Sequence, residues 1–348
     1  MSKLAVLCVR NEGAFLLEWL AHHRGIGFTD FLVFSNDCDD GTDAMLDRLA
    51  AMGELTHIRN DGPHEGGVQW TAMKIADKHS LVKNADWLMT LDIDEFVNIH
   101  VGDHTLDALI ATLPDADAIT LTWRLFGNAG VERFQDRPVT EIFDRAAPAV
   151  MYWPWRAFMF KTLYRNTGAY RKLGVHRPRS PVGGKADATR WFDGEGRELE
   201  ARFRRQQIFS PFGRSNIALA QLNHYALGAM ESYIVKRDRG RAVHGGDSLG
   251  LDYWSERNWC QVQDRSIRAC DALRDTHLGR LRADQTLADL HAQAVAWRQN
   301  RFRTLMAQDP FRALYGRLLM SPPAQPVPLD RARFLFGFAQ QSKGNPRN

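Results

Sequence analysis

The segment Lys3-Leu-Ala-Val-Leu-Cys-Val9, followed directly by Arg10-Asn11-Glu12, decides the fold class. A short continuous apolar run of this kind is typical of a strand that is buried on both faces. Amphipathic and apolar segments then alternate: further strands are predicted at 31–34, 55–58 and 87–91, and helices at about 12–25, 43–52 and 68–83. This alternation predicts an α/β protein whose mostly parallel sheet is flanked by helices.

Polar residues follow three of the predicted strands at the point where each strand ends. They are Arg10-Asn11-Glu12, Ser35-Asn36-Asp37 and Asp92-Ile93-Asp94-Glu95. Ligands of parallel α/β sheets bind at the carboxyl ends of the strands. We therefore expect the three clusters to meet at one edge of the sheet.

The charges are divided unevenly along the 348 residues, although the formal net charge is only +4. Residues 1–120 contain 8 Lys and Arg against 20 Asp and Glu, and residues 121–348 contain 37 against 21. This division suits a protein that holds a cation with its first part and an anionic ligand with its second.

Cysteine usage and hydropathy bear on the compartment. The four cysteines form no CxxC pair, which favours a reducing environment. No apolar run approaches the roughly 20 residues of a membrane-spanning helix, and the start is too short for a signal peptide. We expect a cytoplasmic protein, and we leave open a peripheral contact with the inner face of a membrane.

The alternation weakens after the strand predicted at 118–123, and this sets the domain boundaries. Residues 123–215 are rich in Trp, Arg, Pro and Gly and are expected to form a loop-rich cover over the sheet. One α/β domain is predicted over 1–228, in two parts, 1–122 and 123–228. A helical region at 229–320 and a proline-containing tail at 321–348 follow.

Asp92 and Asp94 form a D-x-D motif at the end of a buried strand. On an extended chain both side chains point to one face, where they would hold a Mg²⁺ or Mn²⁺ ion and leave positions for phosphate oxygens. His176 and His224 each end an apolar stretch and would supply a further imidazole ligand. A solvated acidic turn is the structural alternative. A haloacid-dehalogenase-like nucleophile is disfavoured, because that motif closes the first strand of its fold.

Taken together, these residues resemble the nucleotide-sugar glycosyltransferases of the A-type (GT-A) fold. More closely, the chain is similar to the family-two-like bacterial branch that is related to the family ninety-two galactosyltransferases. The matching pieces are Val9-Arg-Asn-Glu12, Glu18-Trp-Leu20, His23, Ser35-Asn-Asp37, Asp40-Gly-Thr42, Gln69, Ala85-Asp-Trp87, Leu91-Asp-Ile-Asp-Glu-Phe96, Trp123-Arg-Leu-Phe-Gly127, Lys161, Val175-His176, Asn223-His-Tyr225, Lys236 and Arg239-Gly240.

The resemblance implies a GT-A-like, Rossmann-like fold and a metal-dependent transfer of sugar, with inversion, from a nucleoside diphosphate sugar. A UDP-sugar is favoured as donor, Mn²⁺ or Mg²⁺ as cofactor, and a glycan or surface polysaccharide as acceptor. It implies that 1–122 binds nucleotide and metal and that 123–228 faces the acceptor. The nucleotide residues would be Arg10, Asn11, Glu12, Asp37, Lys74 and Asp92, the metal ligands Asp92, Asp94, His176 and His224, and the sugar and acceptor residues Glu95, Trp123, Arg124 and Trp155.

An inverting transfer also needs a carboxylate that takes the proton of the acceptor hydroxyl. Asp247, on a Gly-Gly loop, is the preferred candidate, with Glu132 and Asp136 as rivals. Arg237 and Arg239 belong to a basic run that would clamp the diphosphate or lie at a solvated helix end.

Two other classes of function remain open at this point. A nucleotidyltransferase that makes nucleotide sugars would carry a glycine-rich, basic loop after its first strand, and Arg10-Asn-Glu-Gly13 is too acidic for that. A non-enzymatic basic binding module is favoured by the charge of the second part, but its basic residues are interspersed with acids. We therefore expect no nucleic-acid partner, and the oligomeric state stays open.

Overall fold

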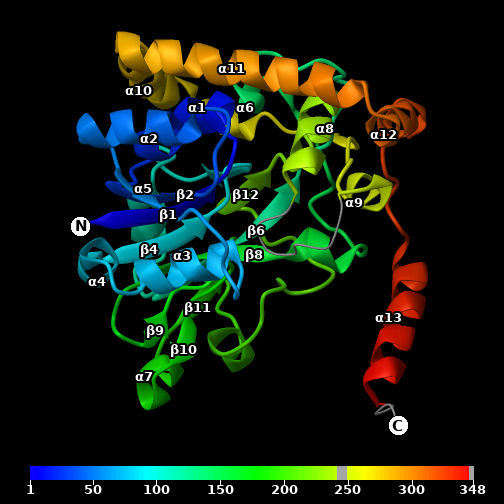
Figure 1. The fold of residues 1–348 in the computed structure, drawn as a ribbon. Helices are drawn as coiled ribbons and strands as arrows, with labels where there is room; N and C mark the ends of the chain where they lie inside the picture. Colours follow the sequence, from blue (N-terminus) through cyan, green and yellow to red (C-terminus); the bar gives the residue numbers. More distant parts are fainter. Residues whose placement is uncertain (241–248, 345–348) are drawn as a thin grey trace.

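A nine-stranded sheet runs through the molecule (Figure 1), and the computed structural model describes residues 1–240 and 249–344, with side chains as far as Phe338. Eight strands follow one another in the order β3-β2-β1-β4-β8-β6-β12-β5, and β11 pairs with β6. The strands of this sheet are β1 (Lys3–Val9), β2 (Asp30–Ser35), β3 (Thr56–Arg59), β4 (Trp87–Leu91), β5 (Glu95–Ile99), β6 (Ala118–Leu125), β8 (Phe160–Arg165), β11 (Trp191–Asp193) and β12 (Ala220–His224).

The expected α/β architecture, with a mostly parallel sheet and helices at the C-terminal end, is confirmed. Strands β1, β2, β3 and β4 pair in parallel, as do β6 with β11 and β6 with β12. Three pairings are antiparallel: β4 with β8, β6 with β8, and β12 with β5. Strands β5, β8 and β11 were not expected: no element was predicted for residues 95–99, and the other two strands lie within 123–215, which was expected to be loop-rich.

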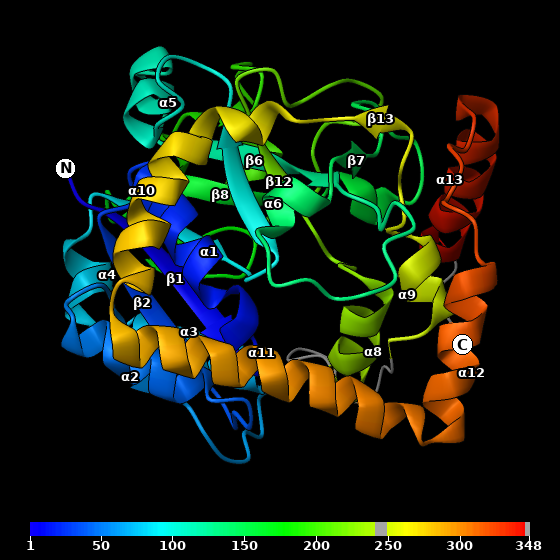
Figure 2. The same cartoon turned by 90° about the horizontal axis from the view of Figure 1, so that it is seen from above.

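Helices cover both faces of the sheet (Figures 1 and 2). In the orientation of Figure 1, α1, α2, α10 and α11 lie above the sheet, and α3, α4 and α7 lie below it. The helices are α1 (Gly13–Gly25), α2 (Thr42–Ala51), α3 (Val68–Ala76), α4 (Ser80–Asn84), α5 (Leu106–Thr112), α6 (Val139–Ile142), α7 (Gly183–Asp187), α8 (Met230–Arg239), α9 (Leu251–Ser255), α10 (Asp271–Arg282), α11 (Gln285–Met306), α12 (Asp309–Met320) and α13 (Leu329–Gly344).

Short elements complete the chain. Strand β7 (Arg145–Ala146) pairs with β13 (Val262–Gln263), and β9 (Tyr170–Lys172) pairs with β10 (Arg179–Pro181). Three 3₁₀ helices span Trp155–Phe158, Ala201–Arg204 and Ser266–Cys270. The helix predicted at 68–83 is broken between α3 and α4, where the Asp77 carboxylate accepts a hydrogen bond from the Leu173 backbone at 2.7 Å.

The side chains of β1 explain why two hydrophobic cores form, one on each face of the sheet. Ala5 and Leu7 belong to the core under α1, α2 and α11, whereas Leu4 and Val6 belong to the core on the α3 face. Successive side chains of a strand point to opposite faces, so a run that is apolar at every position is buried on both.

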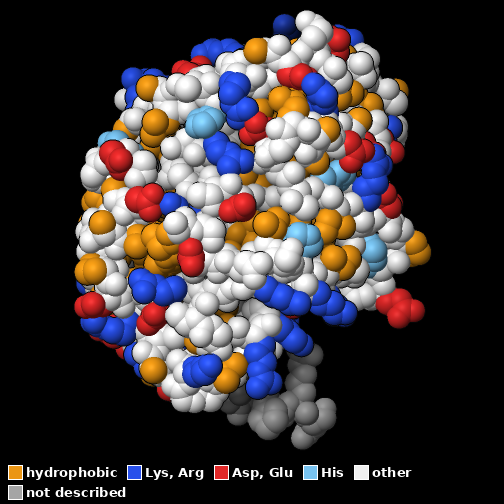
Figure 3. All heavy atoms as spheres, turned by 90° about the vertical axis from the view of Figure 1, so that its left-hand side faces the viewer, with side chains coloured by type: hydrophobic (Ala, Val, Ile, Leu, Met, Phe, Trp, Pro, Cys, Tyr) orange, Lys and Arg blue, Asp and Glu red, His pale blue; other side chains and the backbone are white. Residues whose placement is uncertain are grey.

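The expected meeting of the polar clusters at one sheet edge is confirmed by the strand register. Val9 pairs with Ser35 and Leu7 pairs with Leu91, so the parallel strands β1, β2 and β4 end side by side. The opposite edge, where these strands begin, faces the viewer in Figure 3 and shows basic and acidic side chains interspersed. Within the described residues, no helix has both the length and the apolar character needed to cross a membrane.

His22 and His23 are packing residues. His22 is 2% and His23 0% exposed, and both face β5. The His22 ring lies 2.8 Å from the Val97 carbonyl, and the His23 ring lies 2.8 Å from the Trp19 carbonyl one turn earlier. Burial lowers the pKa of His22 to about 4, so both rings stay neutral inside the core.

Candidate active site

The D-x-D motif forms a turn between β4 and β5, and this corrects the expectation of an extended chain with both carboxylates on one face. Strand β4 ends at Leu91, and the Glu95 backbone donates to the Asp92 carbonyl at 3.1 Å. The turn is stabilised from inside, because the Asp92 backbone donates to the buried Glu95 carboxylate at 2.9 Å. As a result, Asp92 contacts the ammonium of Lys161, whereas Asp94 contacts that of Lys236.

Lys161, the second residue of β8, contacts the first carboxylate of the motif. Its ammonium lies 2.9 Å from Asp92 and 3.1 Å from Glu95, and the side chains of Lys161 and Glu95 are both fully buried. Glu95 also accepts from the Trp123 indole at 2.7 Å. All these partners of Glu95 are donors, and donors favour the carboxylate form. Burial raises the pKa of Glu95, and the charge of Lys161 opposes that rise. Glu95 is therefore a positioning residue for the turn and for Trp123.

Asp94 lies beside His224, which ends β12, and Lys236, which comes from α8. The Lys236 ammonium is 2.7 Å from Asp94 Oδ2, and His224 Nε2 is 3.7 Å from Asp94 Oδ1. Burial alone would raise the pKa of Asp94, but Lys236 and His224 hold it well below its usual range. Burial lowers the pKa of His224, so this imidazole is neutral and its Nε2 can serve as a ligand.

The Trp123 indole separates His224 from His176. Its ring centroid is 4.3 Å from that of His224 and 5.7 Å from that of His176. His176 Nδ1 lies 3.0 Å from the Phe160 carbonyl and must carry the proton there, which leaves Nε2 as an acceptor. Burial, together with the Lys161 charge, lowers the pKa of His176 to about 4.

The loop after β1 meets α8 and α11 at the same edge of the sheet. The Arg239 guanidinium donates to the Arg10 carbonyl at 2.8 Å and pairs with the Glu12 carboxylate, and Asn11 accepts from the Asp39 backbone at 2.7 Å. A cavity of about 330 Å³ opens here between the loops after β1 and β2 and the two helices. It is lined by Arg10, Asn11, Asp39, Asp238, Arg239, Trp297 and Arg301.

Asp37 and Gln69 complete the contacts around this edge. The exposed Asp37 has a positive φ of 45°, and its backbone donates to the Asp61 carboxylate at 2.7 Å. The Arg10 guanidinium donates to the Asp37 carbonyl at 3.2 Å. Buried Gln69, at the start of α3, reaches Asp92 at 3.5 Å.

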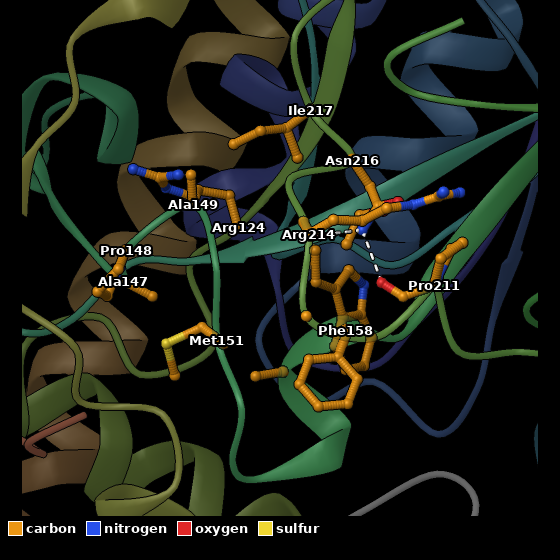
Figure 4. Close-up of a pocket in the computed structure, with 14 residues that line it drawn as sticks. Arg124, Ala147, Pro148, Ala149, Met151, Phe158, Pro211, Arg214, Asn216 and Ile217 are labelled. Carbon is orange, nitrogen blue, oxygen red and sulfur yellow. Dashed lines mark hydrogen bonds between the residues drawn. The ribbon is translucent and has the colours of Figure 1, made fainter. Parts of the chain in front are cut away.

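Arg124 lies on the wrong face of the sheet to contact the D-x-D turn, which corrects its placement beside Trp123. The two residues are consecutive in β6, so their side chains point to opposite faces. The buried Arg124 faces Asp264, at 3.8 Å, and lines a pocket with Met151, Phe158 and other residues (Figure 4).

Two more predicted residues lie elsewhere than expected. Trp155 packs in an aromatic cluster, with its ring centroid 4.5 Å from Trp153 and 5.6 Å from Phe336 of α13. Lys74 is exposed on α3, roughly 140° around the helix from Gln69. The side chain of Gln69 points to the site, and that of Lys74 therefore points away from it.

Glu132 and Asp136, the two rival candidates for the general base, have partners away from the D-x-D turn. Asp247 lies outside the described residues. Asp136 pairs with His291 of α11 at 2.9 Å, and Glu132 is exposed in the loop that contacts the start of α8. Asp136 is thus committed to holding α11 in place.

Metal ligation has partial support in the side-chain arrangement. Over residues 1–240 and 249–344, no three His, Cys, Asp or Glu side chains form a group that could hold a metal ion. Asp94 and His224 are nevertheless adjacent, with Nε2 of the imidazole facing the carboxylate. Their 3.7 Å gap exceeds a hydrogen bond, and adjacent ligands of an octahedral cation about 2.1 Å away are roughly 3.0 Å apart, so the two atoms would have to move closer to share one. Oxygen atoms of a bound ligand would have to complete such a site.

Comparison with protein-family models matches residues 5–190 to the model described as glycosyltransferase family 92. This chain belongs to glycosyltransferase family 92. The matched range contains the loop after β1, the D-x-D turn, Trp123, Lys161 and His176. His224 and the cations of α8 lie beyond it.

Curated relatives and solved structures resemble parts of this family 92 chain. A family 92 protein of Ricinus communis is 24% identical over 144 residues, which cover 37% of this chain and 24% of the relative, and one of Oryza sativa is 24% identical over 139 residues, covering 38% and 22%. The chain thus matches about a quarter of the length of these relatives. A solved structure, S. aureus TarS 1–349 in complex with UDP, shows 16% identity with a TM-score of 0.30, covering 47% of each chain.

Lys161 and Lys236 are the residues to which sequence reasoning gave no role at the motif. Both stand in segments that resemble the family, but a single lysine in an apolar strand or a basic helix carries no local signal of its partner. The partners are 69 and 142 residues away in the chain.

Proposed function

We propose that the protein is a metal-dependent glycosyltransferase that moves a sugar, with inversion, from a nucleoside diphosphate donor, with a UDP-sugar favoured, to a glycan or polysaccharide. Family membership over residues 5–190 supports sugar transfer. The observation that carries the proposal is the contact of Asp94 with His224 and Lys236 at the carboxyl edge of the sheet. A carboxylate, a neutral imidazole and a cation meet there at one point.

The site can neutralise a diphosphate leaving group. A Mn²⁺ or Mg²⁺ ion held by Asp94 and His224 would supply electrostatic stabilisation of the charge that develops on the leaving phosphate. Lys236 and Arg239 stand one helical turn apart on α8, so both ammonium and guanidinium face the sheet edge. They pair with Asp94 and Glu12, and a bound diphosphate would compete for them.

The other residues of the edge orient the donor. Arg10, Asn11, Glu12 and Asp37 line the place proposed for the nucleoside, and Asp92 is held by Lys161 where the ribose would lie. Trp123, fixed by Glu95, presents its indole between the two histidines, which suits the apolar face of a sugar. The general base stays a prediction at Asp247.

A thermal-shift screen with UDP- and GDP-sugars, each with and without Mn²⁺, tests the proposal. A donor that binds the folded chain alone raises the unfolding temperature, since 100 times its Kd of free ligand adds about 2.7 kcal/mol to the free energy of unfolding. Asp94→Asn should lose the increment that depends on Mn²⁺ while circular dichroism shows an intact fold.

Asp115→Asn is the matched control, because Asp115 is exposed and pairs with Arg190 at the surface. It should respond to donor and Mn²⁺ as the wild type does. No stabilisation of the wild type by any nucleotide sugar, or an unchanged Mn²⁺ increment in Asp94→Asn, would contradict the proposal.

A further inference from the structure

Helix α13 carries two of the most exposed aromatic side chains of the described chain. Phe334 is 67% and Phe338 57% exposed, and their ring centroids are 4.9 Å apart. They stand four residues apart and therefore form one stripe on the helix. Exposing two neighbouring phenyl rings to water is costly, so a contiguous aromatic stripe indicates a contact surface.

The opposite side of α13 is the one that packs on the body. Ala332 is fully buried, and the Phe336 ring lies 5.6 Å from Trp155 and 5.0 Å from Phe212. The helix is joined to α12 by the proline-containing segment 321–328 and stands apart from the other helices (Figure 1). The helix is thus fixed by one side, and its aromatic stripe faces outwards.

Cations lie on both sides of the stripe. Arg331 and Arg333 are exposed, and on a helix they stand about 60° to one side and about 100° to the other of Phe334. Asp330, at the first turn, is the single acidic side chain in the described part of α13. An aromatic stripe bordered by arginines suits contact with the headgroup layer of an anionic membrane.

Apolar side chains also lie on the body beside the packed side of α13. Tyr152 lies next to Phe212, with ring centroids 5.7 Å apart, and it also lines a cavity of about 300 Å³ between residues 148–152 and the segment 326–328. Met151 and Pro326 contribute to the same cavity.

We propose that α13 docks the protein on an anionic lipid surface, with Phe334 and Phe338 inserted among the headgroups and Arg331 and Arg333 on lipid phosphates. Arginine side chains at such a surface reach the phosphates while their stems stay in the apolar layer. This placement would bring an acceptor anchored in the same membrane within reach of the enzyme. The docking itself does not depend on the identity of the donor.

Cosedimentation of the full chain with vesicles tests this inference. We expect binding to vesicles of phosphatidylcholine with roughly 30–50% phosphatidylglycerol, which gives a strongly anionic surface. Binding to vesicles of phosphatidylcholine alone, or to the anionic vesicles in about 0.5 M salt, should be at least tenfold weaker. Phe334→Gln with Phe338→Gln, and separately Arg331→Gln with Arg333→Gln, should each lower binding about tenfold. Ile75→Gln, at a 38% exposed apolar residue on α3, should leave it unchanged.

Sedimentation velocity of the same variants separates a lipid surface from a second copy of the chain. A wild type that ignores anionic vesicles overturns the proposal, as does a dimer that the phenylalanine changes convert to a monomer in the absence of vesicles. The thermal response to nucleotide sugars is measured in parallel and should be the same for wild type and α13 variants, so failure of docking and failure of the proposed function are distinguishable.

Discussion

The buried Lys161–Glu95 pair gives the sharpest test of how the D-x-D turn is held. Lys161→Met preserves the length of the side chain and removes its charge, leaving the fully buried Glu95 carboxylate without a cation. An uncompensated buried charge costs roughly 3–5 kcal/mol. Asp92 adds less to this cost, because its side chain is 35% exposed and water screens it.

Protonation of Glu95 sets an upper limit on the loss, and that limit depends on pH. Holding a carboxyl with an ordinary pKa of 4.5 in its neutral form costs about 3 kcal/mol at pH 7 and about 1 kcal/mol at pH 5. In the variant, the folded state binds a proton that the unfolded state releases above pH 4.5, so stability relative to wild type recovers as pH falls. We therefore expect a loss of about 3 kcal/mol at pH 7 that shrinks towards pH 5.

Guanidinium unfolding followed by circular dichroism measures this loss at both pH values. Lys83→Met, at an exposed lysine of α4, is the matched control and should change stability by less than about 0.5 kcal/mol. Adding Glu95→Gln to Lys161→Met removes the unpaired charge and should recover part of the stability and the pH dependence. If the free energy of unfolding of Lys161→Met at pH 7 lies within about 1 kcal/mol of the wild-type value, which is about one-third of the expected loss, the reasoning is refuted.

Two further changes test the α8 contacts and a buried acid. Arg239→Ala should weaken binding of a nucleoside diphosphate about tenfold, as measured by calorimetry. Arg237→Ala is the control and should leave the affinity unchanged, because Arg237 donates to the Leu249 carbonyl at 3.0 Å. Equal losses of affinity in the two variants would contradict the assignment. Burial raises the pKa of Glu18 from 4.5 to about 7 against its hydrogen bonds from Val139 and Thr140, so the free energy of unfolding should fall by roughly 3 kcal/mol as pH rises from about 4.5 to 7. Glu18→Gln should flatten that dependence in urea unfolding measured across the window, and an unchanged slope would count against the buried acid as its source.

Much of the fold could be predicted from local patterns. The apolar run of β1 and the alternation that follows fix the parallel strands β1 to β4, and the polar residues after those strands fix the ligand edge. The antiparallel strands β5 and β8 could not be predicted, because Glu95–Ile99 and Phe160–Arg165 gain their structure from partners far away in the chain.

The sequence by itself determined the sheet edge, the D-x-D motif and the family resemblance, since each depends on residues that are close in the chain. Only the tertiary structure decided how the motif is used: it turns Asp92 towards Lys161 and Asp94 towards His224 and Lys236. It also places Arg124 on the face opposite Trp123. The physical reason is that a buried charge must find a partner in space, and that partner is set by strand register and helix docking, which a local pattern of residues does not contain.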